Sequence, residues 1–192
     1  MTTGHHAHKP FSDKLAFVLN NPIRRWFFPP ERLITKLEIR PNDVVVDFGC
    51  GPGFYLTSIA RVAGKAIGVD VSTRMLYQAA NQAKKSTVKV ELIQSNGTDI
   101  KLPDNCVDLI VLVHVFHEVE DKPTVLREFR RILKSGGRLA IVEKTRPDHL
   151  LPKAFSPPIM DQKEVVQNVQ EADFRFRQAI PDGKDSILIF AR

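Results

Sequence analysis

The sequence is poor in cysteine and has no long apolar run, and each lack excludes a class of protein. Cys50 and Cys106 are the only cysteines, and they do not form a Cys-x-x-Cys motif for zinc or redox chemistry. We expect both to be reduced, because two cysteines are too few for a disulfide framework. No stretch approaches the ~20 apolar residues that span a bilayer, and Met1 to Pro10 lacks the apolar core of a signal peptide. We therefore expect a cytoplasmic protein with no membrane span.

The remaining composition is that of an ordinary globular domain. The chain has 192 residues, of which 43% are hydrophobic and 26% are charged. Its net charge of +6 is uneven, since residues 1–40 hold seven basic residues against three acidic ones. Such a cluster can attract nucleic acid. It can also be a solvated face that aids solubility, and we favour this second interpretation.

Apolar runs alternate with segments in which apolar residues recur at helical spacing. The runs predict strands at 44–46, 66–69, 88–93, 107–113 and 139–143. Helices are predicted at 11–19, from Pro30 to before Pro41, at 56–63, from Ser72 to Lys84, from Pro123 to Gly136-Gly137, and at 164–172. Residues 174–179 and 186–190 flank Pro181-Asp182-Gly183 and predict an antiparallel hairpin. The pattern predicts an α/β fold, a doubly wound, Rossmann-like sheet of seven strands, mostly parallel, with helices on both faces.

A glycine-rich loop follows the first predicted strand, and an acidic residue precedes it. Gly49, Gly51 and Gly53 let the backbone approach a ligand closely. A dinucleotide fingerprint aligned on the first two of these glycines needs a third at position 54, which is Phe54. The order is instead D-x-G-x-G-x-G, and the carboxylate of Asp47 suits an ammonium group better than a pyrophosphate, which it would repel.

A second acidic residue, Asp70, ends the second predicted strand about 20 residues beyond the loop. A carboxylate at this position can accept hydrogen bonds from both hydroxyls of a ribose. The loop and Asp70 together predict a nucleoside-bearing ligand at the carboxyl ends of the strands.

Four segments together resemble the class I S-adenosylmethionine-dependent methyltransferases, especially the small-molecule branch of ubiquinone-biosynthesis-like enzymes (methyltransferase type 11). The segments are Val-Val-Asp-Phe-Gly-Cys-Gly-Pro-Gly at 45–53, Gly-Val-Asp-Val-Ser at 68–72, Leu-Pro-Asp-Asn-Cys-Val-Asp-Leu-Ile-Val at 102–111 and Leu-Arg-Glu-Phe-Arg-Arg-Ile-Leu-Lys-Ser-Gly-Gly-Arg-Leu at 126–139. The resemblance implies S-adenosylmethionine as cofactor and in-line transfer of its methyl group to a small-molecule acceptor. From the chain length and the extent of the core fold we expect one globular unit, with an N-terminal helical lid at 1–40 and the methyltransferase domain at 41–192.

The resemblance further implies which residues contact the cofactor. The three glycines would lie against its methionine part, Asp47 would support the ammonium group, and Asp70 would hold the ribose. The backbone at Val113 would face the amino-acid end, and the usual position of the acid near adenine falls on Thr98, with Asp99 beside it. The expected cofactor contacts are Asp47, Gly49, Cys50, Gly51, Gly53, Asp70, Val71, Thr98, Asp99 and Val113.

His117 is the expected general base, with Glu118 a less favoured one. Both follow the fourth strand, and a base is useful when an acceptor hydroxyl must lose a proton. A purely structural histidine is the alternative. We expect Cys50 to be a small filler and not a nucleophile, and we expect no metal site, because His5, His6 and His8 lack accompanying ligands.

Other features leave the acceptor open. The N-terminal helix, Trp26-Phe27-Phe28 and the segment 145–161 are expected to form the acceptor pocket and lid. The basic N-terminus, with Arg24 and Arg25, keeps open a methyltransferase or binding module that acts on RNA or protein. A nicotinamide-dependent oxidoreductase and a cofactor-binding subunit without activity are two further alternatives.

Overall fold

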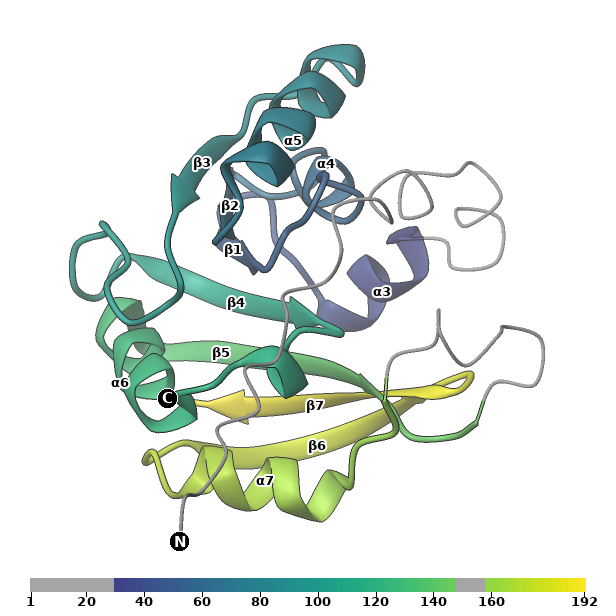
Figure 1. Cartoon of the computed structure of the whole chain (residues 1–192), viewed down its shortest axis with the longest axis vertical. Coiled ribbons are helices and arrows are strands. Elements are labelled where there is room, and N and C mark those ends of the chain that lie inside the picture. The colour runs from purple at the N-terminus through teal and green to yellow at the C-terminus, as the bar shows by residue number, and fades with distance from the viewer. Residues whose placement is uncertain (1–29, 148–157) are drawn as a thin grey trace, which may run out of the picture.

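The fold is one seven-stranded sheet with helices on both faces (Figure 1). The computed structural model describes residues 30–147 and 158–192. Its elements are α3 (Pro30–Leu37), β1 (Val44–Phe48), α4 (Leu56–Ile59), β2 (Lys65–Asp70), α5 (Thr73–Lys85), β3 (Glu91–Gln94), β4 (Val107–Val113), the 3-10 turn η2 (Phe116–Glu118), α6 (Lys122–Ile132), β5 (Leu133–Lys144), α7 (Gln162–Gln170), β6 (Arg175–Asp182) and β7 (Asp185–Ala191).

The strand order β3-β2-β1-β4-β5-β7-β6 confirms the doubly wound prediction. Strands β1 to β5 pair in parallel, whereas β7 runs antiparallel to both β5 and β6. The chain moves outward from β1 to β3 and then returns to place β4 on the other side of β1. In open sheets of this kind, ligands bind beyond the carboxyl ends of the strands at such a switch point.

Neighbouring valines of β1 point to opposite faces of the sheet and belong to separate apolar clusters. Val46 packs in a cluster that includes side chains of α6 and α7. Val45 packs in a second cluster with side chains of α3, α4 and α5. Because side chains alternate along a strand, a strand that is covered on both faces is apolar throughout. This is why the valine run at 44–46 predicted a parallel strand.

The predicted end of α6 was wrong. The helix ends at Ile132, and Leu133 is already extended, with φ −66° and ψ 139°. Gly136 and Gly137 therefore lie within β5 and do not close the helix. The reason is strand pairing, because Leu133 pairs with Val107 at the start of β4, before the glycines are reached.

The hairpin prediction was confirmed, although its turn is shifted along the chain. Asp182 pairs with Asp185, so the turn consists of Gly183 and Lys184. Gly183 has φ +65°, a conformation that favours glycine and so places the turn there.

Helix α3 is part of the core although it lies within the predicted lid. Leu33 and Leu37 are buried in the cluster that contains β1 residues. Arg138 of β5 also donates to the carbonyl of Leu37 at 2.8 Å. The predicted helix at 11–19 and the Trp26-Phe27-Phe28 segment lie outside the described residues.

Candidate cofactor and acceptor site

The glycine loop begins where β1 ends, next to β4. Gly49, Gly51 and Gly53 have φ values of +70°, +51° and +86°, which are strained for residues with a side chain. The N–H groups of Gly49 and Cys50 donate to the carbonyl of Val69 at 2.7 and 3.0 Å. These two bonds hold the start of the loop against the end of β2, at the switch point of the sheet.

The first two glycines serve different purposes. A Cβ atom at Gly49 would lie 2.5 Å from Cγ2 of Val115, so this glycine lets the segment after β4 pack against the loop. A Cβ atom at Gly51 would meet nothing within 4 Å. Gly51 is therefore the position where the loop backbone borders open space, as a closely bound ligand requires.

Asp70 is fixed by backbone hydrogen bonds on both carboxylate oxygens. Oδ2 accepts from the N–H of Gly51 and Oδ1 accepts from the N–H of Ser72, each at 2.9 Å. Ser72 also caps α5, as predicted, because its Oγ accepts from the N–H of Met75 at 3.3 Å. Each carboxylate oxygen keeps a second acceptor site, so Asp70 can still receive the two hydroxyl groups of a ribose.

Asp47 is a buried carboxylate with an unsatisfied oxygen. Its side chain is 3% exposed, and Oδ2 has no hydrogen-bond partner among the described residues. Burial, followed by repulsion from Asp70, raises its pKa from 3.8 to about 7, although the Leu56 backbone partly offsets this. A cation beside Asp47 would satisfy this oxygen and stabilise its charge, so the residue fits the ammonium end of S-adenosylmethionine.

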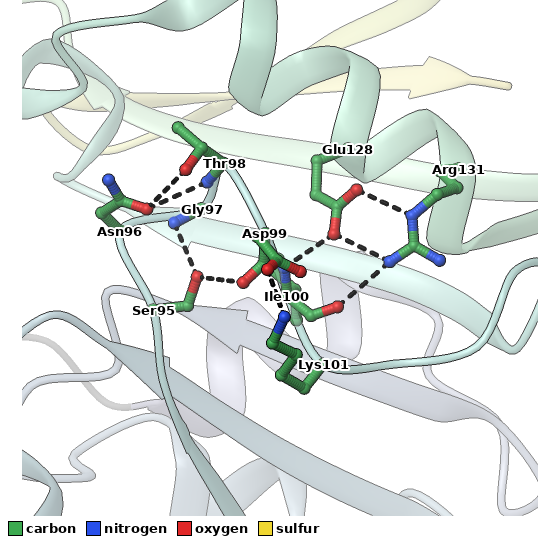
Figure 2. Close-up of polar contacts among 9 residues, drawn as sticks. All are labelled: Ser95, Asn96, Gly97, Thr98, Asp99, Ile100, Lys101, Glu128 and Arg131. Carbon is green, nitrogen blue, oxygen red and sulfur yellow. Dashed lines mark hydrogen bonds and ion pairs between the residues drawn. The ribbon is translucent and has the colours of Figure 1, made fainter.

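Figure 2 shows the loop after β3, where Thr98 and Asp99 were expected to lie near adenine. Oδ1 of Asn96 accepts from the backbone N–H of Thr98 at 3.2 Å and from its Oγ1 at 2.9 Å. Asp99 forms an ion pair with Lys101. Both predicted residues are exposed and already have partners within their own loop. The loop also contacts Asp70, the residue expected to hold the ribose, because the N–H of Ser95 donates to the carbonyl of Asp70 at 3.1 Å.

A carboxylate–guanidinium pair on α6 holds this loop, and sequence reasoning missed it (Figure 2). Oε1 of Glu128 accepts from the N–H of Ile100 at 2.7 Å, and Arg131 donates to the carbonyl of the same residue at 3.0 Å. Arg131 also bonds both oxygens of Glu128, at 2.7 and 2.8 Å, which lowers the pKa of that carboxyl. An acid and an arginine three residues apart on a helix were the available signal, but their shared target lies 28 residues away in sequence.

The remaining cofactor candidates lie around the loop with different exposure. Val71 is 61% exposed, directly after Asp70. Val113 ends β4 and pairs with Val142 of β5. Cys50 is buried, and burial raises the pKa of its thiol, which disfavours the nucleophilic thiolate and supports the filler interpretation.

His117 and Glu118 lie on η2, in the segment after β4 that packs against the glycine loop through Val115. The His117 ring is 14% exposed, and its Nδ1 lies 3.1 Å from Oε2 of Glu143, a residue that sequence reasoning missed. The only signal for Glu143 was an acid at the end of an apolar strand. Burial raises the pKa of Glu118. The neighbouring His117 opposes this shift, whereas the charges of Glu143 and Asp70 add to it. The pKa of Glu118 therefore depends on the charges of both Asp70 and His117.

Fold and site together define a nucleoside-binding protein of the doubly wound class. A diphosphate would be repelled by the carboxylate of Asp47 when it is ionised, whereas the two acids match the ammonium and ribose groups of an amino acid joined to a nucleoside. In the part of the chain that the structure describes, no helix is long and apolar enough to cross a membrane.

Similarity to known proteins identifies the chemistry. The model of the methyltransferase domain family matches residues 46–141. The 2-phytyl-1,4-naphthoquinone methyltransferase of Synechococcus elongatus is 30% identical, over 92% of this chain and 83% of the relative. The demethylmenaquinone methyltransferase of Symbiobacterium thermophilum is 34% identical over 59% of this chain and 47% of the relative. The crystal structure of an S-adenosylmethionine-dependent methyltransferase from Aquifex aeolicus superposes with a TM-score of 0.84 at 28% identity, covering 94% of this chain and 98% of the other.

The chain belongs to the methyltransferase domain family and is an S-adenosylmethionine-dependent methyltransferase. This confirms the expected family, fold, cofactor and reaction class. It also removes the nicotinamide-dependent oxidoreductase from the alternatives.

Proposed function

We propose that this enzyme methylates a small aromatic acceptor of the hydroquinone type, with the cofactor held by the glycine loop, Asp47 and Asp70. The observation that carries the cofactor assignment is the pair of acids at the switch point. Asp70 is fixed by two N–H groups, and Asp47 has a buried oxygen that no other described residue bonds. One acid suits a ribose and the other suits an ammonium group, and S-adenosylmethionine carries both groups.

The acceptor class is supported by the names of two relatives, which refer to quinones. A reduced quinone is a nucleophile at ring oxygen or carbon only once a proton has left. His117 is the side chain proposed to take that proton, because it lies on the segment that packs against Gly49 through Val115.

The reaction needs a methyl donor and a group that takes the proton of the acceptor. When bound, S-adenosylmethionine supplies a methyl group on a sulfonium. The glycine loop, Asp47 and Asp70 would hold the methyl donor, and Nε2 of His117 would take the proton that the acceptor loses as it is methylated. Holding the two reactants in line contributes much of the acceleration, so few catalytic side chains are needed.

The domain arrangement is part of the same proposal. The N-terminal part, 1–40, would form the lid, and residues 41–192 would form the methyltransferase domain, as the sequence predicts; residues 1–29 and 148–157 lie outside the described residues. The alternative of an RNA acceptor depends on the basic N-terminus, and Arg24 and Arg25 lie outside the described residues.

Calorimetric titration with S-adenosylhomocysteine tests the cofactor site. Wild type should bind, whereas Asp70→Ala should weaken binding at least about 100-fold, because two hydrogen bonds to a charged group are lost at about 1.5–3 kcal/mol each. Glu91→Ala is the control at the start of β3, where the exposed carboxylate pairs with Lys65, and it should change the affinity much less. Equal binding by wild type and Asp70→Ala would overturn the ribose assignment.

Release of S-adenosylhomocysteine with a panel of acceptors tests the acceptor class. Reduced naphthoquinones and benzoquinones should support turnover, and their oxidised forms should not, because only the reduced ring has a proton to lose and electron density to donate. Turnover with RNA or protein and none with any quinol would contradict the proposal.

A further inference from the structure

Glu143 is a buried carboxylate near the carboxyl end of β5. It is the second-last residue of β5, is 2% exposed, and pairs with Ser186 of β7. The preceding residue of β5 pairs with Val113, the last residue of β4. Strand pairing therefore places this carboxylate beside the segment that follows β4. A buried carboxylate is costly unless it receives hydrogen bonds.

His117 is the histidine that meets this carboxylate at hydrogen-bond distance. Its Nδ1 lies 3.1 Å from Oε2 and 3.3 Å from Oε1 of Glu143, and its backbone N–H lies 3.4 Å from Oε1. Ring and backbone are thus held by one acid from a different element. On the other side of the ring, Nε2 lies 3.8 Å from Oε1 of Glu118, which is beyond hydrogen-bond distance.

His114 faces the same carboxylate but is not held by it. Its Nδ1 is 4.0 Å from Oε2 of Glu143 and has no hydrogen-bond partner among the described residues. Its Nε2 lies 3.4 Å from Oδ2 of Asp185, the first residue of β7. The carboxylate therefore distinguishes between two nearby imidazoles and binds His117.

We propose that Glu143 is a positioning residue that holds His117 in the tautomer with the proton on Nδ1, so that the lone pair of Nε2 is free for the acceptor. A carboxylate can only accept, so the Nδ1 atom facing it must be the donor, and the second ring nitrogen of a neutral imidazole is then an acceptor. The same carboxylate stabilises the positive ring that forms once Nε2 has taken a proton. The role in turnover rests on the proposed function, whereas the tautomer does not.

Nitrogen NMR of the full chain tests the tautomer without any acceptor. Long-range proton–nitrogen spectra of protein with labelled histidine, at a pH where the rings are neutral, should show the Nδ1–H form for His117. Glu143→Leu removes the acceptor and should shift His117 toward the Nε2–H form. His114→Asn is the matched control, because asparagine tolerates the positive φ of +57° at this position, and it should leave the His117 signals unchanged. An Nε2–H form in wild type overturns the proposal even if Glu143→Leu fails to fold.

Kinetics then separate positioning from structural support. Once an acceptor is identified, Glu143→Gln should lower kcat at least about tenfold, because the neutral amide cannot stabilise the charged ring. The KM for S-adenosylmethionine should stay within about twofold, and Glu143→Asp should restore part of the rate. A rise in that KM with unchanged kcat overturns the positioning role. If no acceptor is turned over at all, the proposed function fails while the NMR result still decides the tautomer.

Discussion

The charge of Asp47 couples cofactor binding to pH. Burial and Asp70 raise its pKa to about 7, whereas a bound ammonium group favours the ionised form. Cofactor binding should therefore release a proton below pH 7. We expect the affinity for S-adenosylhomocysteine to fall as the pH falls below about 7, approaching about tenfold per pH unit. Calorimetry between about pH 6 and pH 8 measures this slope.

Two substitutions separate this coupling from general effects of pH. Asp47→Asn should bind weakly and lose the slope, because the amide does not titrate. Asp108→Asn is a matched control, since Asp108 is the second residue of β4, at the amino end of the strand and away from the glycine loop, and pairs with Lys134. It should keep the wild-type slope. A flat profile in wild type would contradict the ammonium assignment.

The raised pKa of Asp47 also affects the stability of the free enzyme. The folded carboxyl binds its proton more tightly than the unfolded one, so its contribution to stability is fully present below about pH 3.8 and is lost as the pH rises through about 7. A bound cation reverses this loss. The acid is therefore kept for binding at the expense of the stability of the free protein.

The glycine loop can be tested with two alanine substitutions that each place a Cβ atom at a positive φ. Gly51 and Gly136 both have positive φ, and a Cβ atom at either would meet nothing within 4 Å. Each alanine should cost about 1–2 kcal/mol of strain and lower Tm by several degrees. Only Gly51→Ala should weaken S-adenosylhomocysteine binding, by at least about tenfold, because its Cβ atom enters the space for the cofactor.

Differential scanning fluorimetry with and without S-adenosylhomocysteine gives both quantities at once. The two variants should have similar melting temperatures alone, and the ligand should raise Tm for Gly136→Ala and hardly at all for Gly51→Ala. Equal ligand-induced shifts would show that the cofactor does not lie against Gly51.

Glu128 and Arg131 of α6 both bond the backbone of Ile100 in the loop after β3, and these contacts can be tested separately. Glu128→Gln removes the charge that Arg131 neutralises and disturbs the bond to the N–H of Ile100. The free energy of unfolding should fall by about 1–3 kcal/mol, which lowers Tm by about 2–4 °C per kcal/mol in a protein of this size. Thermal unfolding measures this loss. Glu164→Gln on the exposed surface of α7 is the control and should change Tm by less than about 1 °C.

The position of each residue in the chain decided what could be predicted from the sequence. Asp47 and the three glycines lie within seven residues, and Asp70 follows at the end of the next strand, so their spacing was readable. Glu143 was not, because it reaches His117 only through the pairing of β4 with β5, 26 residues further on. The end of α6 was mispredicted for the same reason, since pairing with β4 outweighed the glycine signal at 136–137.

At the scale of the whole molecule, the sheet order places the proposed cofactor acids and the proposed base on neighbouring strands or just after them. Asp47 is the second-last residue of β1 and Asp70 is the last residue of β2, whereas His117 follows β4 and Glu143 is the second-last residue of β5. With β1 between β2 and β4, the proposed cofactor acids lie on one side of the switch point and the proposed base lies on the other. A cofactor bound across β1 and β2 would then present its methyl group toward the histidine side.

The most direct measurement is the crystal structure of the enzyme with S-adenosylhomocysteine. We expect both ribose hydroxyls within hydrogen-bond distance of Asp70, the ammonium group beside Asp47, and the sulfur directed toward the segment that carries His117. A ligand bound elsewhere on the sheet, or one whose ribose makes no contact with Asp70, would contradict the account.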